Sequence, residues 1–173
     1  DTLAALQMIA EKYLQEVSPI VIGITGSNGK TTTKDMTASV LAQKYKVHKT
    51  EGNFNNHLGL PLTILRMAED TEVAVLEMGM SGKGEIELLS TLAKPHLAVI
   101  TNIGESHLLD LGSREGIADA KLEILTGLQE DGVVIYNGDE PLLKEKLKHA
   151  SFNLQSFGRS QQNTIYPLHI EAG

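Results

Sequence analysis

The chain has 173 residues, with 15 basic and 22 acidic side chains, a formal net charge of −7 and no cysteine. This length is typical of a single domain with one core, and the acidic balance, without a basic stripe and interleaved aromatic residues, argues against nucleic acid as a partner. The lack of cysteine excludes a thiolate nucleophile, a disulfide framework and cysteine-ligated metal centres within these residues. No apolar run approaches the roughly 20 residues of a membrane span and the first residues lack the profile of a signal peptide, so we expect a cytoplasmic protein without membrane insertion.

Helical and β-rich segments alternate along the chain. Apolar residues recur every three or four positions from Leu3 to Val17, which predicts an amphipathic lead-in helix that Ser18 and Pro19 end. The predicted strands are 20–25, 47–50, 73–77, 97–102, 133–137 and 153–157. The predicted helices are 30–43, 61–67, 85–93, 113–128 and 140–148, the last with Asp139 as its N-cap. This order divides the chain into a lead-in helix and linker over 1–19 and one βαβ domain over 20–173.

The strand pattern predicts an α/β fold of the P-loop type, with a mostly parallel sheet flanked by helices. Segments such as VAVLEM and LAVIT are apolar on both faces, as expected for strands that helices cover on each side. The tail GRSQQNTIYPLHIEAG predicts an irregular polar connection followed by an edge strand. Ligands of open parallel sheets bind beyond the carboxyl ends of the strands, so we expect the loops after the first, third and fourth strands to form one site.

The segment VIGITGSNGKTTTKD (21–35) predicts a strand, a glycine-bearing turn and the start of a helix. An anion over such a helix N-terminus meets N–H donors and the positive end of the helix dipole, while Lys30 adds a charge and the Thr31 hydroxyl suits a magnesium ion. The turn is not a strict Walker A motif, because Ile24 stands where that motif has its first glycine. A merely flexible turn is the alternative, but it explains Gly-Lys-Thr at a helix start poorly. The predicted phosphate-binding residues are Gly26, Ser27, Asn28, Gly29, Lys30, Thr31 and Thr32.

Two side chains after later strands are candidate metal ligands. Glu77 ends a buried strand, where a carboxylate is costly unless it is paired or bound to a cation. Magnesium ligation is therefore favoured over an ordinary glutamate at the rim. His107 by itself is weak evidence, and it gains weight only from its position after the fourth strand.

Two further groups have simpler explanations. Asn53, Asn55 and Asn56 lie in the loop after the second strand, where turn geometry and polar substrate recognition are about equally well supported. Lys121 lies between two acidic residues on a predicted helix. From its neighbours alone it is a solvated lysine.

Five segments together resemble the central ATP-binding domain of the Mur ligases, which build the peptide stem of bacterial peptidoglycan. They are TGSNGKTTTKD, GNFNNHLGLPLT, LEMGMSGKGEI, TNIGESHLLDLGSREGIADAKLEI and NGDEPLL, and the resemblance covers about 20–143. The family's version of the turn, Thr-Gly-x-Asn-Gly-Lys-Thr, accounts for the departure from Walker A. The resemblance implies that 26–32 hold the ATP phosphates, with Lys30 on the β- and γ-phosphates and Thr31 on magnesium, and that 53–56 lie near the substrate.

The resemblance also implies the remaining catalytic groups. Glu77 and His107 would hold the metal ions. Lys121 stands at the family's Ala-Lys-x-Glu position, which implies a carbamylated lysine near the second magnesium ion. Lys30, His107 and Lys121 are therefore the expected catalytic residues, with ATP and Mg²⁺ as the expected cofactors.

The implied reaction is an ATP-dependent ligation. A substrate carboxylate attacks the γ-phosphate to give an acyl phosphate and ADP, and an amine then displaces phosphate. The segments NFNNHLGLPLT and EMGMSGKGEI favour the branch whose substrates are UDP-N-acetylmuramoyl-tripeptide and D-alanyl-D-alanine. We expect the protein to be a monomer. Another Mur-type or folylpolyglutamate-type ligase is the alternative within the family.

Two other classes remain to be weighed against the ligase. A GTPase would need an Asn-Lys-x-Asp motif, which the sequence lacks, and a non-catalytic nucleotide-binding module would not need Glu77 and His107. The match itself has gaps: the family's base-contacting His-Asn pair, its UDP-sugar-binding domain and its C-terminal domain are all missing. We therefore expect 20–173 to be a central domain truncated at its C-terminal end, and the isolated chain to be nearly inactive.

Overall fold

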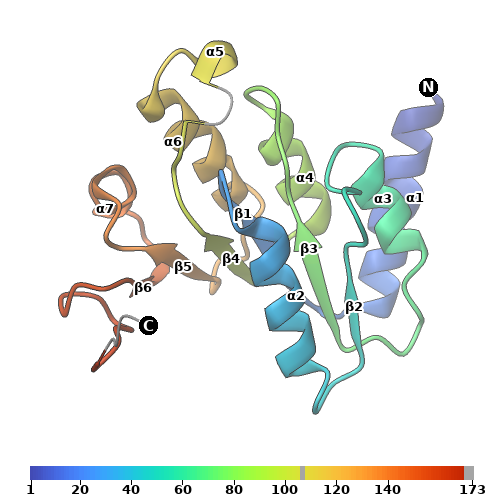
Figure 1. Cartoon of the computed structure of the whole chain (residues 1–173). Coiled ribbons are helices and arrows are strands. Elements are labelled where there is room, and N and C mark those ends of the chain that lie inside the picture. The colour runs from blue at the N-terminus through green and yellow to red at the C-terminus, as the bar shows by residue number, and fades with distance from the viewer. Residues whose placement is uncertain (106–107, 170–173) are drawn as a thin grey trace.

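Six parallel strands form one sheet through the centre of the molecule, in the order β2-β3-β1-β4-β5-β6 (Figure 1). The computed structural model describes residues 1–105 and 108–169. The strands are β1 (Ile20–Thr25), β2 (Val47–Lys49), β3 (Val73–Glu77), β4 (Leu97–Ile100), β5 (Val133–Asn137) and β6 (Asn153–Phe157). The predicted α/β fold with a parallel sheet is confirmed, and the strand boundaries differ from the prediction by at most two residues.

The helices connect the strands and cover both faces of the sheet (Figure 1). They are α1 (Thr2–Val17), α2 (Lys30–Leu41), α3 (Gly59–Leu65), α4 (Glu85–Ala93), α5 (Leu108–Leu111), α6 (Arg114–Leu122) and α7 (Pro141–Leu147), with the short 3-10 helix η1 (Glu123–Leu125). The prediction of one helix over 113–128 was wrong, because the chain tightens into η1 after Leu122. There the Ser90 hydroxyl of α4 donates to the Ile124 carbonyl and accepts from the Gly127 amide.

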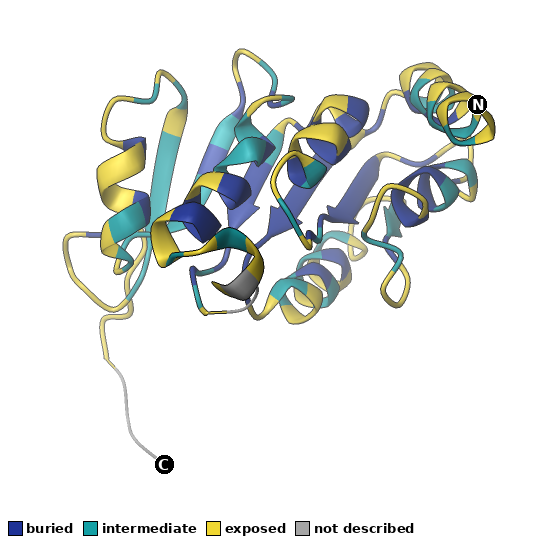
Figure 2. Ribbon diagram, turned by 90° about the horizontal axis from the view of Figure 1, so that it is seen from above, coloured by how far each residue is buried: buried dark blue, intermediate teal, exposed yellow. Residues whose placement is uncertain are grey.

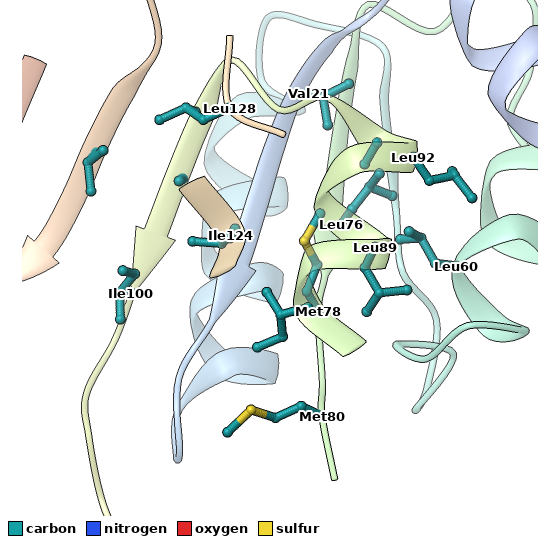
Figure 3. Packing of buried hydrophobic residues seen from close by; sticks show 14 of the residues in the cluster. Val21, Leu60, Leu76, Met78, Met80, Leu89, Leu92, Ile100, Ile124 and Leu128 are labelled. Atoms are coloured by element: carbon teal, nitrogen blue, oxygen red, sulfur yellow. The ribbon is translucent and has the colours of Figure 1, made fainter. Parts of the chain in front are cut away.

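Two apolar clusters lie on opposite faces of the central strands. Successive side chains of a strand point to opposite faces, so Val21 of β1 joins the larger cluster while its neighbour Ile22 joins the smaller one, which includes Ala38 of α2. The larger cluster packs the sheet against α1, α3, α4 and α6 (Figure 3). Every residue of β3 is buried, and the outward surfaces of the helices are exposed (Figure 2). This burial on both faces confirms the doubly covered sheet.

Helix α1 packs against the body of the domain, next to α3. Ala10 and Leu14 are buried in the larger cluster, and the Tyr13 hydroxyl donates to the Met67 carbonyl at 2.6 Å. Ser18 takes a left-handed conformation with φ of 51° and donates its amide to the Leu14 carbonyl, which confirms the predicted helix end. No helix within the described ranges is long and apolar enough to cross a membrane.

Two local predictions near the end of the chain were wrong. Glu140, not Asp139, is the N-cap of α7, and its side chain accepts from the Leu142 amide. The Asp139 carboxylate instead holds the following chain, because it accepts from the amides of Arg159 and Ser160. The predicted edge strand does not form in the described part of the tail, where only an isolated bridge links 157 and 165.

Candidate functional site

The carboxyl ends of the central strands surround a pocket of about 450 Å³ on one edge of the sheet. Its walls come from the turn between β1 and α2, the loop between β2 and α3, and the end of β3. The lining residues are Ser27, Asn28, Gly29, Lys30, Thr31, Thr32, Gly52, Asn53, Asn55 and Glu77. The loops after the first and third strands therefore meet, as predicted, and the loop after the second strand joins them. The described residues of the loop after β4, which was expected in the same site, do not line this pocket.

The backbone of the glycine turn leaves no room for a side chain at Gly26. Gly26 has φ of 149°, and a Cβ there would lie 1.8 Å from the Thr101 hydroxyl oxygen. The amides of Ser27 and Asn28 are used inside the protein, since they donate to the carbonyl and the side-chain oxygen of Asn102 at 3.1 and 3.0 Å. The first amides of α2 have no acceptor within their own helix. Those of Lys30, Thr31 and Thr32 are therefore the donors available to an anion in the pocket.

Lys30 adds a full positive charge to these donors. Its ammonium donates to the Gly26 carbonyl at 2.8 Å, so the side chain folds back across the turn that it follows. The side chain is half-buried and lines the pocket. This arrangement of helix amides and one ammonium suits a phosphate group.

Glu77 is the buried carboxylate of the site, with only 2% of its surface exposed. One oxygen accepts from the Thr31 hydroxyl at 3.0 Å and the other from the Asn55 side-chain amide at 2.9 Å. Within 1–105 and 108–169, no lysine or arginine forms an ion pair with Glu77. A buried carboxylate whose hydrogen-bond partners are all neutral favours a cation bound beside it.

The donor set fits magnesium in part. Glu77 and Thr31 offer the hard oxygen ligands that this ion prefers. In the described part of the chain no group of three or more His, Cys, Asp or Glu side chains could hold a metal. The described residues therefore supply few ligands by themselves, as is usual for magnesium that is shared with a nucleotide. The predicted ligand His107 lies outside the described residues.

The asparagines of the loop over 53–56 face in two directions. Asn53 and Asn55 line the pocket, and Asn55 also holds Glu77. The Asn56 side chain faces α3, because its oxygen accepts from the amides of Leu58 and Gly59 at 3.1 and 2.8 Å. The turn-geometry explanation therefore fits Asn56, while Asn53 and Asn55 are available to ligands.

Lys121 is buried, with 2% of its surface exposed, so the expectation of a solvated helix lysine was wrong. Its acidic neighbours point elsewhere: Asp119 pairs with Lys146 and Glu123 accepts from the Gly84 amide. The pKa of Lys121 is lowered to about 8, mainly because the side chain is buried and also because the positive charge of Lys30 disfavours a second cation. A buried lysine with a lowered pKa is typical of functional sites.

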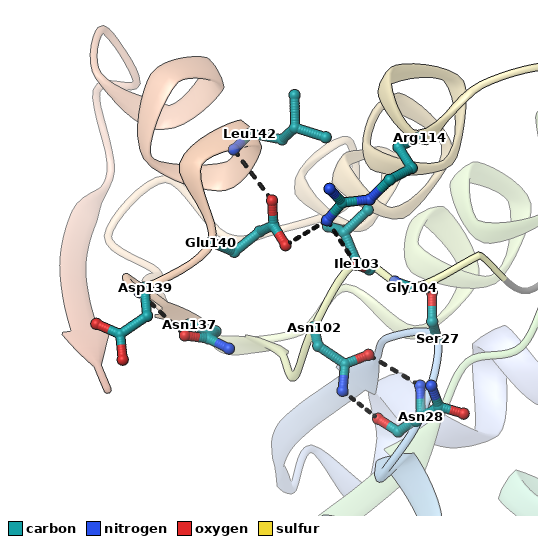
Figure 4. Close-up of polar contacts among 10 residues, drawn as sticks. All are labelled: Ser27, Asn28, Asn102, Ile103, Gly104, Arg114, Asn137, Asp139, Glu140 and Leu142. Atoms are coloured by element: carbon teal, nitrogen blue, oxygen red, sulfur yellow. Dashed lines mark hydrogen bonds and ion pairs between the residues drawn. The ribbon is translucent and has the colours of Figure 1, made fainter. Parts of the chain in front are cut away.

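The structure adds residues that the sequence did not single out. Asn102 and Gly104, which follow β4, form hydrogen bonds to the glycine turn (Figure 4). Arg114 of α6 donates to the carbonyl of Ile103, which lies between them. The only signal for Asn102 in the sequence was its position at the end of the predicted strand 97–102, at the same edge of the sheet as the glycine turn.

Comparison with known proteins decides the family. The model of the Mur ligase middle domain matches residues 24–172. The chain belongs to the Mur ligase family. This Mur ligase domain is 62% identical over 178 residues to the UDP-N-acetylmuramoyl-tripeptide–D-alanyl-D-alanine ligase of Bacillus subtilis, a match covering 97% of the chain and 39% of that relative. The chain thus spans about two fifths of the length of that relative.

Solved structures of Mur ligases share the fold of this domain. A MurF crystal structure from Acinetobacter baumannii matches with a TM-score of 0.92 at 36% identity, covering 99% of this chain and 37% of that one. MurF from Thermotoga maritima in complex with ADP matches with a TM-score of 0.87 at 38% identity, covering 92% and 37%. The Mur ligase middle domain is therefore similar in both sequence and structure to a relative that binds ADP.

Proposed function

We propose that this chain is the ATP-binding domain of a cytoplasmic ligase that joins D-alanyl-D-alanine to UDP-N-acetylmuramoyl-tripeptide in peptidoglycan synthesis. The observation that carries the proposal is the pocket in which the first amides of α2, the Lys30 ammonium and the pair of Thr31 and Glu77 converge. The 62% identity to a relative named for this reaction supports the choice of substrates.

The residues of the pocket would act on the phosphates of ATP. The amides of α2 and Lys30 bind the β- and γ-phosphates and neutralise the charge that the transferring phosphoryl group carries. The substrate carboxylate attacks the γ-phosphorus, the bond to the β–γ bridging oxygen breaks and ADP leaves. The amine of the dipeptide then attacks the acyl carbon and loses a proton to water, and inorganic phosphate departs with the electrons of the carbon–oxygen bond.

Thr31, Glu77 and His107 are the residues that we propose for magnesium. When bound, the ion supplies charge neutralisation at the phosphates. Asn55 holds one oxygen of Glu77, and so fixes the direction in which the carboxylate presents the other. Lys121 is proposed to carry a carbamate, formed when its neutral amine adds carbon dioxide. That step turns a cation beside Lys30 into an anion that could attract the second magnesium ion.

A coupled assay with the intact protein that contains this chain tests the function. We expect ADP formation that requires both UDP-N-acetylmuramoyl-tripeptide and D-alanyl-D-alanine, with the ligated pentapeptide as product. Parallel reactions should contain other Mur substrates, or a folate and glutamate. Turnover with one of these sets alone would support the alternative ligases, and nucleotide binding without any ADP formation would support a non-catalytic module.

Replacing Glu77 with glutamine should raise the magnesium concentration needed for half-maximal activity by roughly ten- to a hundredfold, because the variant keeps the hydrogen-bonding shape and loses the charge that holds the ion. Titration of activity with Mg²⁺ at saturating ATP measures the effect. Glu51→Gln removes an exposed carboxylate from the same edge and is the control. His107→Ala, acting through the same ion, should be non-additive with Glu77→Gln. Additive losses at an unchanged magnesium requirement would contradict the assignment.

A further inference from the structure

The four residues 101–104 that follow β4, here called the exit segment, form hydrogen bonds to the glycine turn, and Figure 4 draws the last three of them. The Thr101 hydroxyl donates to the Asn28 carbonyl at 2.6 Å, and the Gly104 amide donates to the Ser27 hydroxyl at 2.8 Å. Asn102 lies between these contacts, and its backbone carbonyl accepts from the Ser27 amide at 3.1 Å. Three of the four residues of the exit segment are therefore hydrogen-bonded to Ser27 or Asn28.

The Asn102 carboxamide makes the most specific of these contacts. Its oxygen accepts from the Asn28 amide at 3.0 Å, and its nitrogen donates to the Asn28 carbonyl at 3.3 Å (Figure 4). Both backbone polar groups of Asn28 are therefore bound by one side chain, which orients the peptide groups on either side of that residue. Gly29 follows with φ of 78° and leads directly into α2. The orientation of Asn28 thus determines where the first amides of the helix point.

Arg114 anchors the exit segment from the other side. Its guanidinium donates to the Ile103 carbonyl at 3.1 Å and pairs with the Glu140 carboxylate at 2.8 Å (Figure 4). The Glu140 side chain is only 10% exposed, and its second oxygen accepts from the Leu142 amide at the start of α7. The guanidinium is therefore held in a fixed position by a carboxylate that is itself fixed.

A second ion pair joins the same two helices without reaching the exit segment. Lys146 of α7 pairs with Asp119 of α6 at 2.6 Å, and both side chains are more than a quarter exposed. This pair links α6 to α7 just as the pair of Arg114 and Glu140 does. It therefore provides an internal control for effects that come only from docking the two helices.

We propose that the exit segment sets the shape of the phosphate-binding turn, with Asn102 and Arg114 as positioning residues. Asn102 acts directly on Asn28, and Arg114 acts through Ile103. The proposal rests on the proposed function, because the turn must bind phosphate for its shape to matter. Neither residue lines the pocket, so their loss should weaken binding without removing a charge from the pocket.

Calorimetry with the intact protein, using inorganic tripolyphosphate and ATP as probes, tests the proposal. Asn102→Ala should weaken both ligands by roughly five- to thirtyfold, as expected for two hydrogen bonds. Arg114→Ala should weaken them roughly threefold to tenfold. Arg114→Lys should restore part of the affinity, because an ammonium keeps the charge but lacks the planar fork. Asp119→Asn, which weakens only the exposed pair with Lys146, should change both affinities less than about twofold.

The double variant of Asn102 and Arg114 should lose less than the product of the single losses, since both act on one segment. Unchanged affinities in Asn102→Ala would overturn the proposal, and so would an equal loss in Asp119→Asn and Arg114→Ala. A wild-type protein that binds neither tripolyphosphate nor ATP would instead overturn the proposed function on which this inference rests.

Discussion

Replacing Lys30 with alanine is expected to weaken tripolyphosphate and ATP binding by roughly ten- to a hundredfold, the usual worth of a charge-assisted hydrogen bond. The ammonium lines the pocket beside the first amides of α2, and its present partner is a backbone carbonyl of the turn. A phosphate oxygen would be a stronger acceptor than this neutral carbonyl. Calorimetry at fixed ionic strength measures the loss, and thermal unfolding should show that the domain stays folded.

The matched control is Lys83→Ala. Lys83 is an exposed lysine in the loop after β3, and it does not line the pocket. Its removal changes the net charge by the same amount and should leave the phosphate affinity within about twofold. Equal losses in the two variants would show that only the overall charge attracts the phosphates, and would contradict the role given to Lys30.

Replacing Lys121 with alanine is expected to lower the turnover of the intact ligase by roughly a hundredfold or more, with partial recovery when acetate is added. The carbamate proposed at this lysine is an anion in a buried position, where the charge of Lys30 already lowers the pKa of the amine. The cavity left by alanine would admit a small carboxylate that replaces it. Initial rates with and without acetate measure the recovery.

Two controls separate this role from a structural one. Lys121→Arg keeps a cation that cannot form a carbamate, so acetate should not restore its activity. The wild-type protein should not respond to acetate at all. Near-normal activity of Lys121→Ala without acetate would refute the carbamate.

The pKa of Lys121 gives the direction of the pH dependence. A pKa of about 8 leaves about a tenth of the amines neutral at pH 7 and about half at pH 8, whereas an ordinary lysine stays almost fully charged at both. Only the neutral amine adds carbon dioxide. At a fixed concentration of dissolved carbon dioxide, carbamate on the wild-type protein should therefore increase between pH 7 and pH 9.

The sequence predicted the sheet well because strand signals are local. The run over β3 is apolar at every position before its last residue, Glu77, and only a strand covered on both faces buries such a run. The split between α6 and η1 could not be predicted in this way. It depends on the Ser90 hydroxyl, which lies more than thirty positions from its partners Ile124 and Gly127.

The site shows the same division between local and distant causes. The glycine turn and Glu77 are visible in the sequence, because each stands at the end of an apolar strand. The burial of Lys121 is not visible, since its acidic neighbours suggest a solvated surface and only the fold shows that they face other partners. The contacts of Asn102 are likewise hidden, because they join residues 74 positions apart.

The hydrogen bond between Thr31 and Glu77 bears on the order in which ligands arrive. In the described residues, this hydroxyl and this carboxylate are the oxygen groups that meet at the end of β3, and they satisfy each other at 3.0 Å. Magnesium binds six ligands in an octahedron, so most of its shell must come from water and phosphate. A free cation would gain only these two ligands from the described residues by breaking the hydrogen bond between Thr31 and Glu77. A cation already chelated by a triphosphate brings its other ligands with it. The domain should therefore take up the metal and the nucleotide as one species, and metal occupancy should follow the nucleotide concentration.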